Sequence, residues 1–285
     1  MKIAILGPGA IGSTFAFHLA KAGHEVTVVA RTTRLEQLKR DGAIVMASGD
    51  KAPVQVAPSL DPSIEFDLVL VTVLAPQVDA VLPALKESKA KKVMFMFNTF
   101  EPLGRLRDAV GANRFSFGFP AVLATFDAEG RLTSAIVTSG QVTTVTDAEL
   151  CEVFTRSGIK SVVHGDMESW LRTHVAFVVP FMIGVARAYE RKAGLSLSET
   201  WRLANALDEG MRVVRKLGNK ITPAPMVALS WLPRVNVAVL LWIATRINGL
   251  RKSGVAGMKE PTALIESMEA TAPGQIPKLR AVLGS

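Results

Sequence analysis

The chain has little cysteine, few aromatic residues and no long run of one charge, and each shortage excludes a class of protein. Cys151 is the single cysteine among 285 residues, which excludes an internal disulfide and most thiolate metal clusters. Aromatic residues make up 6% of the chain, and no run of Lys and Arg exceeds two. No nucleic-acid-binding motif, zinc spacing, nucleophile elbow or Walker motif is present. We therefore expect no bound metal and no nucleic-acid partner.

Export and membrane signals are also weak. The first apolar run, residues 2–6, reads as a strand rather than as a signal peptide. The most apolar stretch, residues 227–247, contains Pro233, Arg234 and Asn236, so it lacks the roughly 18 consecutive apolar residues of a spanning helix. We interpret it as a helix pair buried in a domain core or in a dimer core. The sequence therefore predicts no membrane partner and a cytoplasmic location.

The chain is instead rich in apolar residues and in positive charge. Hydrophobic residues make up 49% of it, the formal net charge is +8, and its length indicates two domains. The charge fits a nucleic-acid surface, a membrane surface or a site for anionic small molecules. Because Lys and Arg are scattered, we favour a basic solvated surface around an anionic cofactor site.

A glycine-rich motif opens the chain. Gly7, Gly9 and Gly12 lie between the apolar residues 2–6 and a helical pattern, which is the strand–turn–helix context of a dinucleotide-binding loop. Gly7 permits the tight turn, Gly9 lets the backbone approach a pyrophosphate at the helix N-terminus, and Gly12 lets the helix pack close to the strand. Ala10 and Ile11 belong to the same predicted cofactor-binding loop.

The end of the second predicted strand indicates which cofactor binds. Residues 25–30 are followed by Arg31 rather than by an acid. An acid would bind the ribose 2′-hydroxyl of NAD, whereas an arginine suits the 2′-phosphate of NADP. The sequence thus predicts an NADP(H) site. Arg34 either assists Arg31 or is a free surface residue.

Strands and helices alternate along the first half of the chain. The apolar run at 67–73 is typical of a strand inside a parallel sheet, and residues 92–97 are predicted to form another buried strand. Further strands are predicted at 43–46, 54–56, 115–118, 131–138, 141–146 and 159–164, and helices at 35–40 and 147–158, with Pro76 in the first turn of another.

From residue 166 onward the pattern is helical. Pro180 is expected to interrupt a helix over 167–192, and glycines punctuate the later helices, namely Gly194, Gly218, Gly254 and Gly274. We therefore predict an α/β fold, with a Rossmann-type doubly wound NADP-binding domain over 1–165 and an all-helical C-terminal domain over 166–285.

Ligands of open α/β sheets bind at the carboxyl ends of the strands. This rule brings two short segments to the predicted cofactor site, and their residues are Thr72, Val73, Leu74, Asn98 and Thr99. We expect Asn98 to contact the nicotinamide or the substrate, the alternative being a turn-capping role.

Together these features resemble the ketopantoate reductase (2-dehydropantoate 2-reductase) family. The matching features are the glycine motif at 7–13, residues 23–26, Arg31, the run 67–73, Gln77, Asn98 and the long helix near Trp170. The resemblance implies a Rossmann domain, a helical second domain and a cleft between them. It further implies NADPH-dependent reduction of a small anionic 2-oxo acid, a place in pantothenate biosynthesis, and a homodimer.

The chain departs from the family where substrate chemistry is expected. In the family a Lys follows the position of Trp170 by two residues and an Asn lies four residues beyond that Lys, whereas this chain has Arg172 and Ala176. Leu74 stands near a further family Lys, and a late family Glu corresponds to Glu260. The Trp-Leu-Arg-Thr-His motif at 170–174 resembles the signature of a divergent branch of the family.

Ketone reduction needs a hydride and a proton, and a proton donor works best with a pKa near the operating pH. Arg172, whose pKa stays above about 12, is a poor donor but suits a carboxylate clamp or an oxyanion contact; the alternative is an interdomain ion pair. His174, with an unperturbed pKa of about 6.5, is the predicted replacement donor, and the alternative is a structural histidine beside Trp170. The two point roughly 200° apart on a regular helix. Glu260 is the third catalytic candidate, against a solvated helix-start carboxylate.

Three functions remain open on this reading. The first is an NADPH-dependent reductase of a small 2-oxo acid. The second is a non-catalytic NADP(H)-binding sensor, which the Arg172 and Ala176 replacements favour. The third is an NADP-dependent dehydrogenase of a different alcohol.

Overall fold

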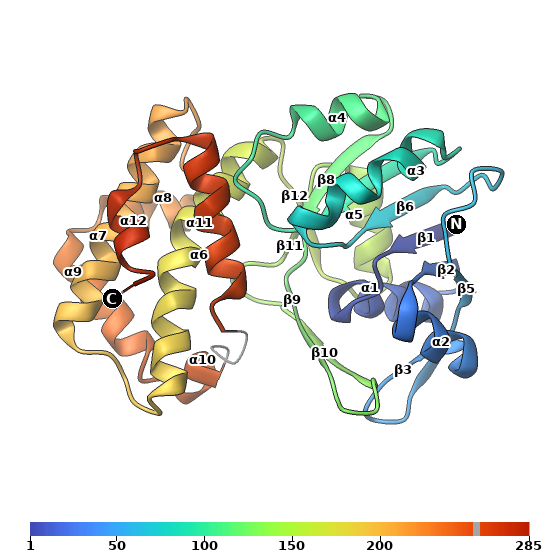
Figure 1. The fold of residues 1–285 in the computed structure, drawn as a ribbon, viewed down its shortest axis with the longest axis horizontal. Helices are drawn as coiled ribbons and strands as arrows, with labels where there is room; N and C mark the ends of the chain where they lie inside the picture. The colour runs from blue at the N-terminus through green and yellow to red at the C-terminus, as the bar shows by residue number, and fades with distance from the viewer. Residues whose placement is uncertain (253–256, 285) are drawn as a thin grey trace. The chain divides into compact units, whose positions relative to one another are not determined.

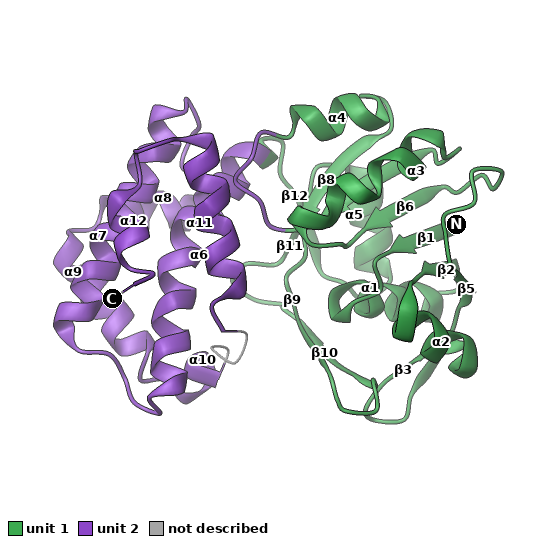
Figure 2. Cartoon of the chain, viewed as in Figure 1, with its two compact units in different colours: residues 1–97, 103–167 green, residues 98–102, 168–285 purple. Residues whose placement is uncertain are grey.

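The computed structural model describes residues 1–252 and 257–284, so Gly254 lies outside the described residues. Contacts between residues divide the chain into two compact units (Figure 2). The first unit comprises residues 1–97 and 103–167, and the second comprises residues 98–102 and 168–285. Each unit has its own hydrophobic core.

The first unit is built on one eight-stranded sheet (Figure 1). The strand order is β12-β11-β8-β7-β6-β1-β2-β5, and neighbours pair in parallel except β8 with β11. The chain winds from β1 to β2 and β5 and then crosses to β6, so the strand order reverses between β1 and β6. The strands are β1 (Lys2–Leu6), β2 (Glu25–Val29), β5 (Gln55–Ala57), β6 (Leu68–Val71), β7 (Lys92–Met96), β8 (Phe115–Phe119), β11 (Thr143–Val145) and β12 (Ser161–Val163).

Helices cover both faces of this sheet, which is why its central strands are apolar at nearly every position. On one face, Phe15 of α1 (Ala10–Lys21) meets Phe154 of α5 (Ala148–Arg156) edge to face at 5.2 Å and packs over Ile3 and Ile5. On the other face, Arg107 of α4 (Gly104–Val110) lies over the Phe115 ring. The remaining helices of this unit are α2 (Thr32–Asp41), α3 (Leu82–Glu87) and the 3₁₀-helix η1 (Ala75–Ala80), which has Pro76 in its first turn. The predicted doubly wound sheet is confirmed.

Two small antiparallel hairpins lie outside the main sheet. They pair β3 (Ala43–Val45) with β4 (Lys51–Pro53) and β9 (Val122–Phe126) with β10 (Leu132–Ile136). The sequence predicted β3 and β10 but missed their partners. The sequence of β9 is Val-Leu-Ala-Thr-Phe, and its second residue, Leu123, is apolar although it is 65% exposed. The sequence therefore lacks the alternation of apolar and polar residues that predicts a half-buried strand.

The second unit is helical, as predicted. Its core joins Val175 and Val179 of α6 (Met167–Glu190) to Leu203 and Leu207 of α7 (Leu197–Lys216) and to Leu264 of α11 (Lys259–Thr271). The other helices are α8 (Ala224–Trp231), α9 (Arg234–Ala244), α10 (Asn248–Lys252) and α12 (Pro277–Ala281).

Helix α6 continues through Pro180 as one helix of 24 residues, so the predicted interruption there is wrong. Proline removes one helical hydrogen bond, and the packing of α6 in the core of the second unit sustains the helix on both sides of it.

Two segments pass a test of length and apolar composition for membrane crossing. Helix α6 passes it alone, although 78% of the tested window is buried within the protein, and α8 with α9 passes it only as a pair bent by 117°. The core helix of a globular protein has the same length and composition, so this finding is weak evidence for a membrane span.

Helices α8 and α9 form the predicted helix pair, but most of their apolar side chains are not buried in the domain core. Val237, Ala238 and Leu241 face the core, whereas α8 has no buried residue. Eight large apolar side chains in and beside this pair are 39–79% exposed, and they are Trp231, Leu232, Val235, Val239, Leu240, Ile243, Ile247 and Leu250. We call these eight residues the apolar face. The predicted burial in the domain is wrong for them, and burial in a dimer stays a prediction.

Candidate functional site

The glycine loop lies between β1 and α1, and each of its three glycines meets different surroundings. Gly7 has φ +89°, and a Cβ there would lie 2.7 Å from the Cγ1 of Val73. A Cβ on Gly12 would lie 2.3 Å from the Oγ1 of Thr72 and 2.6 Å from the carbonyl oxygen of Gly7. A Cβ on Gly9 would meet nothing within 4 Å. Gly7 and Gly12 thus allow tight packing, and Gly9 faces open space where a ligand can approach.

The first turn of α1 is suited to an anion. Gly9 is the N-cap and supplies no side-chain hydrogen bond, so the first N–H groups of the helix, at Ala10, Ile11 and Gly12, lack a side-chain cap. These groups and the positive end of the helix dipole form an anion-binding position. The turn contains no acidic residue.

Side chains from other elements hold the loop in place. The Oγ1 of Thr72 donates to the carbonyl oxygen of Gly7 at 2.8 Å. The carbonyl oxygen of Pro8 accepts from Ser13 Oγ at 3.0 Å and from Arg34 Nε at 3.2 Å, and Arg34 Nη2 donates to Ser13 Oγ at 2.8 Å. Arg34 therefore positions the loop and is not the free surface residue that one reading expected.

Arg31 differs from Arg34 in exposure. It follows β2, acts as the N-cap position of α2, and is exposed. Burial lowers the pKa of Arg34, and its guanidinium lies 4.3 Å from the centre of the Phe126 ring. Of these two arginines, Arg31 is the one that can reorient toward a phosphate.

The segment after β6 carries the other predicted cofactor contacts of the first unit. Val73 packs against Gly7, and Leu74 is 66% exposed with its backbone N–H donating to Gln77 Oε1 at 3.2 Å. Gln77 is one of the residues that matched the family, and it closes the start of η1. An exposed leucine thus occupies the place near the family lysine.

Residues 98–102 follow β7 in the chain, but they belong to the second unit. Asn98 Nδ2 donates to Glu260 Oε1 of α11 at 3.4 Å. Asn98 Oδ1 is buried and accepts no hydrogen bond from any residue that the structure describes. The Oγ1 of Thr99 accepts from the N–H of Glu101 at 3.2 Å, so Thr99 rather than Asn98 caps this turn. A buried acceptor without a partner is costly, and a hydrogen-bond donor on a ligand would satisfy it.

Arg172 is bound to the protein in several directions. Its Nε donates to the carbonyl oxygen of Phe100 at 3.1 Å, its Nη1 lies 2.5 Å from Asn219 Oδ1 and 3.0 Å from Glu168 Oε1, and its guanidinium lies over the Phe100 ring. Only 5% of the residue is exposed. Burial lowers the pKa of Arg172, and the Glu168 carboxylate raises it. Arg172 forms an ion pair with Glu168 within α6, which differs from the interdomain ion pair expected as the alternative to a ligand role.

His174 is buried and stacks on Trp170, with ring centres 5.2 Å apart and planes inclined by 12°. Burial lowers the pKa of His174 from 6.5 to about 3. The imidazole is therefore neutral at physiological pH.

Ala176 occupies the position of the family asparagine, and helix packing explains its size. It is fully buried, and a Cβ on Gly210 of α7 would lie 3.0 Å from the Cβ of Ala176. The two helices meet here at close range, so a longer side chain at 176 would collide with α7.

The structure brings Asn98 and Glu260 together, and it surrounds Arg172 and His174 with protein groups. Sequence analysis missed Asn219, which accepts from Arg172 and donates from Nδ2 to Ser169 Oγ at 3.1 Å. No local sequence pattern points to Asn219, because 47 residues separate it from Arg172. The sequence prediction also assigned no structural role to Gln77, although its position three residues after Leu74, the N-cap of η1, is typical of a capping residue.

Comparisons with known proteins agree with this geometry. A sequence profile described as "Ketopantoate reductase PanE/ApbA" matches residues 3–146. A 2-dehydropantoate 2-reductase of Vibrio cholerae is 36% identical over 98 residues, 34% of this chain, so the match spans about a third (31%) of that relative.

Solved structures share the fold across the whole chain. The crystal structure of 2-dehydropantoate 2-reductase from Methylococcus capsulatus has a TM-score of 0.71 at 18% identity, covering 100% of this chain and 95% of its own. The structure of D-mandelate dehydrogenase with NADH has a TM-score of 0.69 at 15% identity, with 100% and 97% covered. With the profile spanning half of its length, this chain belongs to the ketopantoate reductase family.

Proposed function

We propose that this protein is an NADPH-dependent reductase of a small 2-oxo acid related to ketopantoate, with hydride transfer in a cleft between its two domains. The Asn98–Glu260 pair carries the proposal. Asn98 follows a central strand, and its amide nitrogen donates to the exposed Glu260 carboxylate, while its amide oxygen is buried without a hydrogen-bond partner among the described residues. Such a pair suits a bound group that offers hydrogen-bond donors.

The residues of the glycine loop fit a dinucleotide phosphate. Gly9 leaves open space, and the uncapped N–H groups of α1 would bind the pyrophosphate. Arg31 would bind the 2′-phosphate, which is the basis for preferring NADP(H) over NAD(H). When bound, the nicotinamide cofactor supplies the hydride, and Asn98 would bind its carboxamide or the substrate.

Of the three predicted catalytic residues, Glu260 is the one whose side chain is exposed, whereas Arg172 and His174 are buried. Its carboxylate would accept a hydrogen bond from a substrate hydroxyl, or would orient a solvent water that protonates the developing alkoxide and leaves as hydroxide to solvent. It would also repel the substrate carboxylate, which orients the 2-oxo acid. The catalytic role of Glu260 rests on this chemistry and on its contact with Asn98.

Arg172 and His174 would act indirectly. Arg172 binds the Phe100 carbonyl, so we assign it the positioning of residues 98–102, which include Asn98. A neutral imidazole at position 174 is a poor proton donor, so we assign His174 a packing role against Trp170.

A second candidate function is a non-catalytic NADP(H)-binding sensor. It is favoured by the fact that both basic candidates of the Trp-Leu-Arg-Thr-His motif are buried and bound to protein groups. A dehydrogenase of a different alcohol would share the cofactor loop and differ in substrate alone.

The test is NADPH oxidation, followed by absorbance, with 2-dehydropantoate and a panel of small 2-oxo acids, beside a direct NADPH-binding assay. Turnover of a 2-oxo acid at an ordinary enzymatic rate supports the reductase. NADPH binding with no turnover of any of them supports the sensor. Oxidation of an alcohol by NADP⁺ without 2-oxo acid reduction supports the third function.

We also propose that the apolar face, which spans α8, α9 and the start of α10, is covered by a second copy of this chain in the cytoplasm. Eight large apolar side chains in one stretch of the chain are 39–79% exposed, and large exposed apolar patches often mark protein interfaces. A dimer by light scattering that Trp231→Asp converts to a monomer is the expected result. A monomer that binds lipid vesicles through this face would contradict it.

A further inference from the structure

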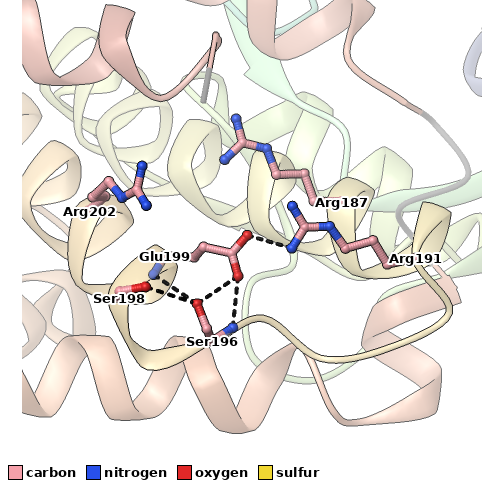
Figure 3. Close-up of a pocket in the computed structure, with 6 residues that line it drawn as sticks. All are labelled: Arg187, Arg191, Ser196, Ser198, Glu199 and Arg202. Atoms are coloured by element: carbon pink, nitrogen blue, oxygen red, sulfur yellow. Dashed lines mark hydrogen bonds and ion pairs between the residues drawn. The ribbon is translucent and has the colours of Figure 1, made fainter.

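A cavity lies in the helical unit, far along α6 from Arg172. Its volume is about 330 Å³, and Arg187, Arg191, Ser196, Ser198, Glu199 and Arg202 line it (Figure 3). We call this set the arginine pocket. Arg187 follows Arg172 by 15 residues on one helix, a distance of about 22 Å along the axis. The residues that line the pocket include neither Asn98 nor Glu260, so the pocket is separate from that pair.

The arginine pocket has an excess of positive charge. Three of its residues are arginines, and Glu199 is the single acid among the residues that line it. Burial lowers the pKa of Arg187, the carboxylate of Glu199 raises it, and the positive charges of Arg191 and Arg202 lower it by smaller amounts. Three guanidinium groups around one carboxylate give the lining of the cavity a net positive charge, which a bound anion would offset.

Both carboxylate oxygens of Glu199 already accept hydrogen bonds from protein groups, so Glu199 neutralises one of the three arginines of the pocket. Its Oε2 accepts from the N–H of Ser196 at 2.9 Å and from Ser196 Oγ at 2.8 Å, and its Oε1 accepts from Arg191 Nη1 at 2.5 Å (Figure 3). The backbone N–H of Ser196, followed by the other contacts, lowers the pKa of Glu199 to about 2. Glu199 holds Arg191 in place. Arg187, whose Nη2 also donates to the Val282 carbonyl oxygen, and Arg202 add two further positive charges to the cavity.

The start of α7 adds polar donors to the same cavity. Ser196 is the N-cap of this 20-residue helix, and Ser196 and Ser198 place two hydroxyl groups 3.1 Å apart. Arginine forks and hydroxyl groups at the positive end of a helix are the donor set that binds phosphate groups. The volume exceeds that of a phosphate alone and lies at the lower end of small-molecule sites.

We propose that the arginine pocket binds the phosphate group of a small anionic molecule at a site separate from the nicotinamide site. Arg187 and Arg202 contact the phosphate, with the Ser196 and Ser198 hydroxyls beside it, and Arg191 is positioned by Glu199. The proposal does not depend on the reductase function.

The test is calorimetric titration of the full chain with inorganic phosphate and with glycerol phosphate, at constant ionic strength with chloride as the reference anion. The main variant is Arg202→Ala, because Arg202 is exposed and its removal leaves the Glu199 contacts in place. The matched control is Arg212→Ala, on the same helix but paired with Asp208 outside the pocket. Arg31→Ala removes the predicted phosphate contact of the nicotinamide site.

We expect saturable phosphate binding that Arg202→Ala weakens by roughly 10- to 100-fold, as for the loss of a charge-assisted hydrogen bond. Arg212→Ala and Arg31→Ala should leave it unchanged. Tighter binding of glycerol phosphate than of inorganic phosphate would identify the ligand as a phosphate ester, and the reverse would identify free phosphate. Binding no stronger than that of chloride, equal in the Arg202 and Arg212 variants, or lost in the Arg31 variant, would overturn the proposal.

Discussion

The glycine loop and the start of α6 both carried expectations from sequence, and they differ in outcome. At the loop, the open space at Gly9 and the close contacts at Gly7 and Gly12 match what a dinucleotide loop requires. At the start of α6, Arg172 and His174 are buried against protein groups. A loop acts through its backbone, which local sequence determines. A helical side chain acts through its direction, which distant packing partners determine.

In the glycine loop, the addition of a single Cβ atom should have the largest effect on cofactor affinity and stability. Gly12→Ala should reduce NADPH affinity more than 100-fold and lower the melting temperature, because its Cβ collides with Thr72 and with the backbone of Gly7. Gly9→Ala is the matched control. It should melt like the parent protein, because its Cβ meets no protein atom, and still bind NADPH more weakly. Equal melting of both variants with the parent would contradict the packing role of Gly12.

Arg31 tests cofactor choice. Arg31→Ala should weaken NADPH by about 1.5–3 kcal/mol, the range for a hydrogen bond to a charged group, and change NADH binding little. The measurement is titration of each cofactor by fluorescence. Equal weakening of both cofactors would remove the basis for preferring NADP(H).

Arg172 tests whether the start of α6 acts through structure. Arg172→Ala should lower the free energy of unfolding by about 1–3 kcal/mol, because it leaves the Phe100 carbonyl and the Asn219 amide oxygen without their donor. We expect kcat to fall as well, because the loss of the bond to Phe100 would displace Asn98. If Arg172 clamps a substrate carboxylate instead, KM would rise while denaturant unfolding stays unchanged.

His174 tests the same region by pH. Its pKa is about 3 in the folded protein and about 6.5 when unfolded, so the unfolded state binds more protons between these values. Its contribution to stability is complete above about pH 6.5 and is lost as the pH falls toward 3. His174→Gln should flatten the dependence of urea unfolding on pH in that window.

Between pH 6 and 9, His174→Gln should leave the shape of the kcat profile unchanged. Loss of an ionisation near pH 6.5 from that profile would show that His174 is the proton donor after all.

Sequence predicted the parts of the fold that short segments determine. The apolar runs became β6 and β7, Asp147 caps α5 by accepting from the N–H of Leu150, and Gly42 ends α2 with φ +58°. Strands β4 and β9 were missed because each is defined by a hairpin partner rather than by its own pattern.

The substrate side depended on contacts between distant residues. Asn98 and Glu260 were each proposed from sequence, but their contact spans 162 residues. The fit of Ala176 against Gly210 and the bonds from Arg172 to Phe100 and Asn219 likewise join separate segments. No local pattern encodes such contacts.

The most direct test of the account compares kcat for NADPH-dependent 2-oxo acid reduction in Glu260→Gln and His174→Gln. We predict that Glu260→Gln reduces kcat by about 100-fold or more, within the range for a positioned acid or base, while His174→Gln changes it less than about threefold. The opposite ranking, or NADPH binding with no turnover in the parent protein, would contradict the assignment of chemistry to the Asn98–Glu260 pair.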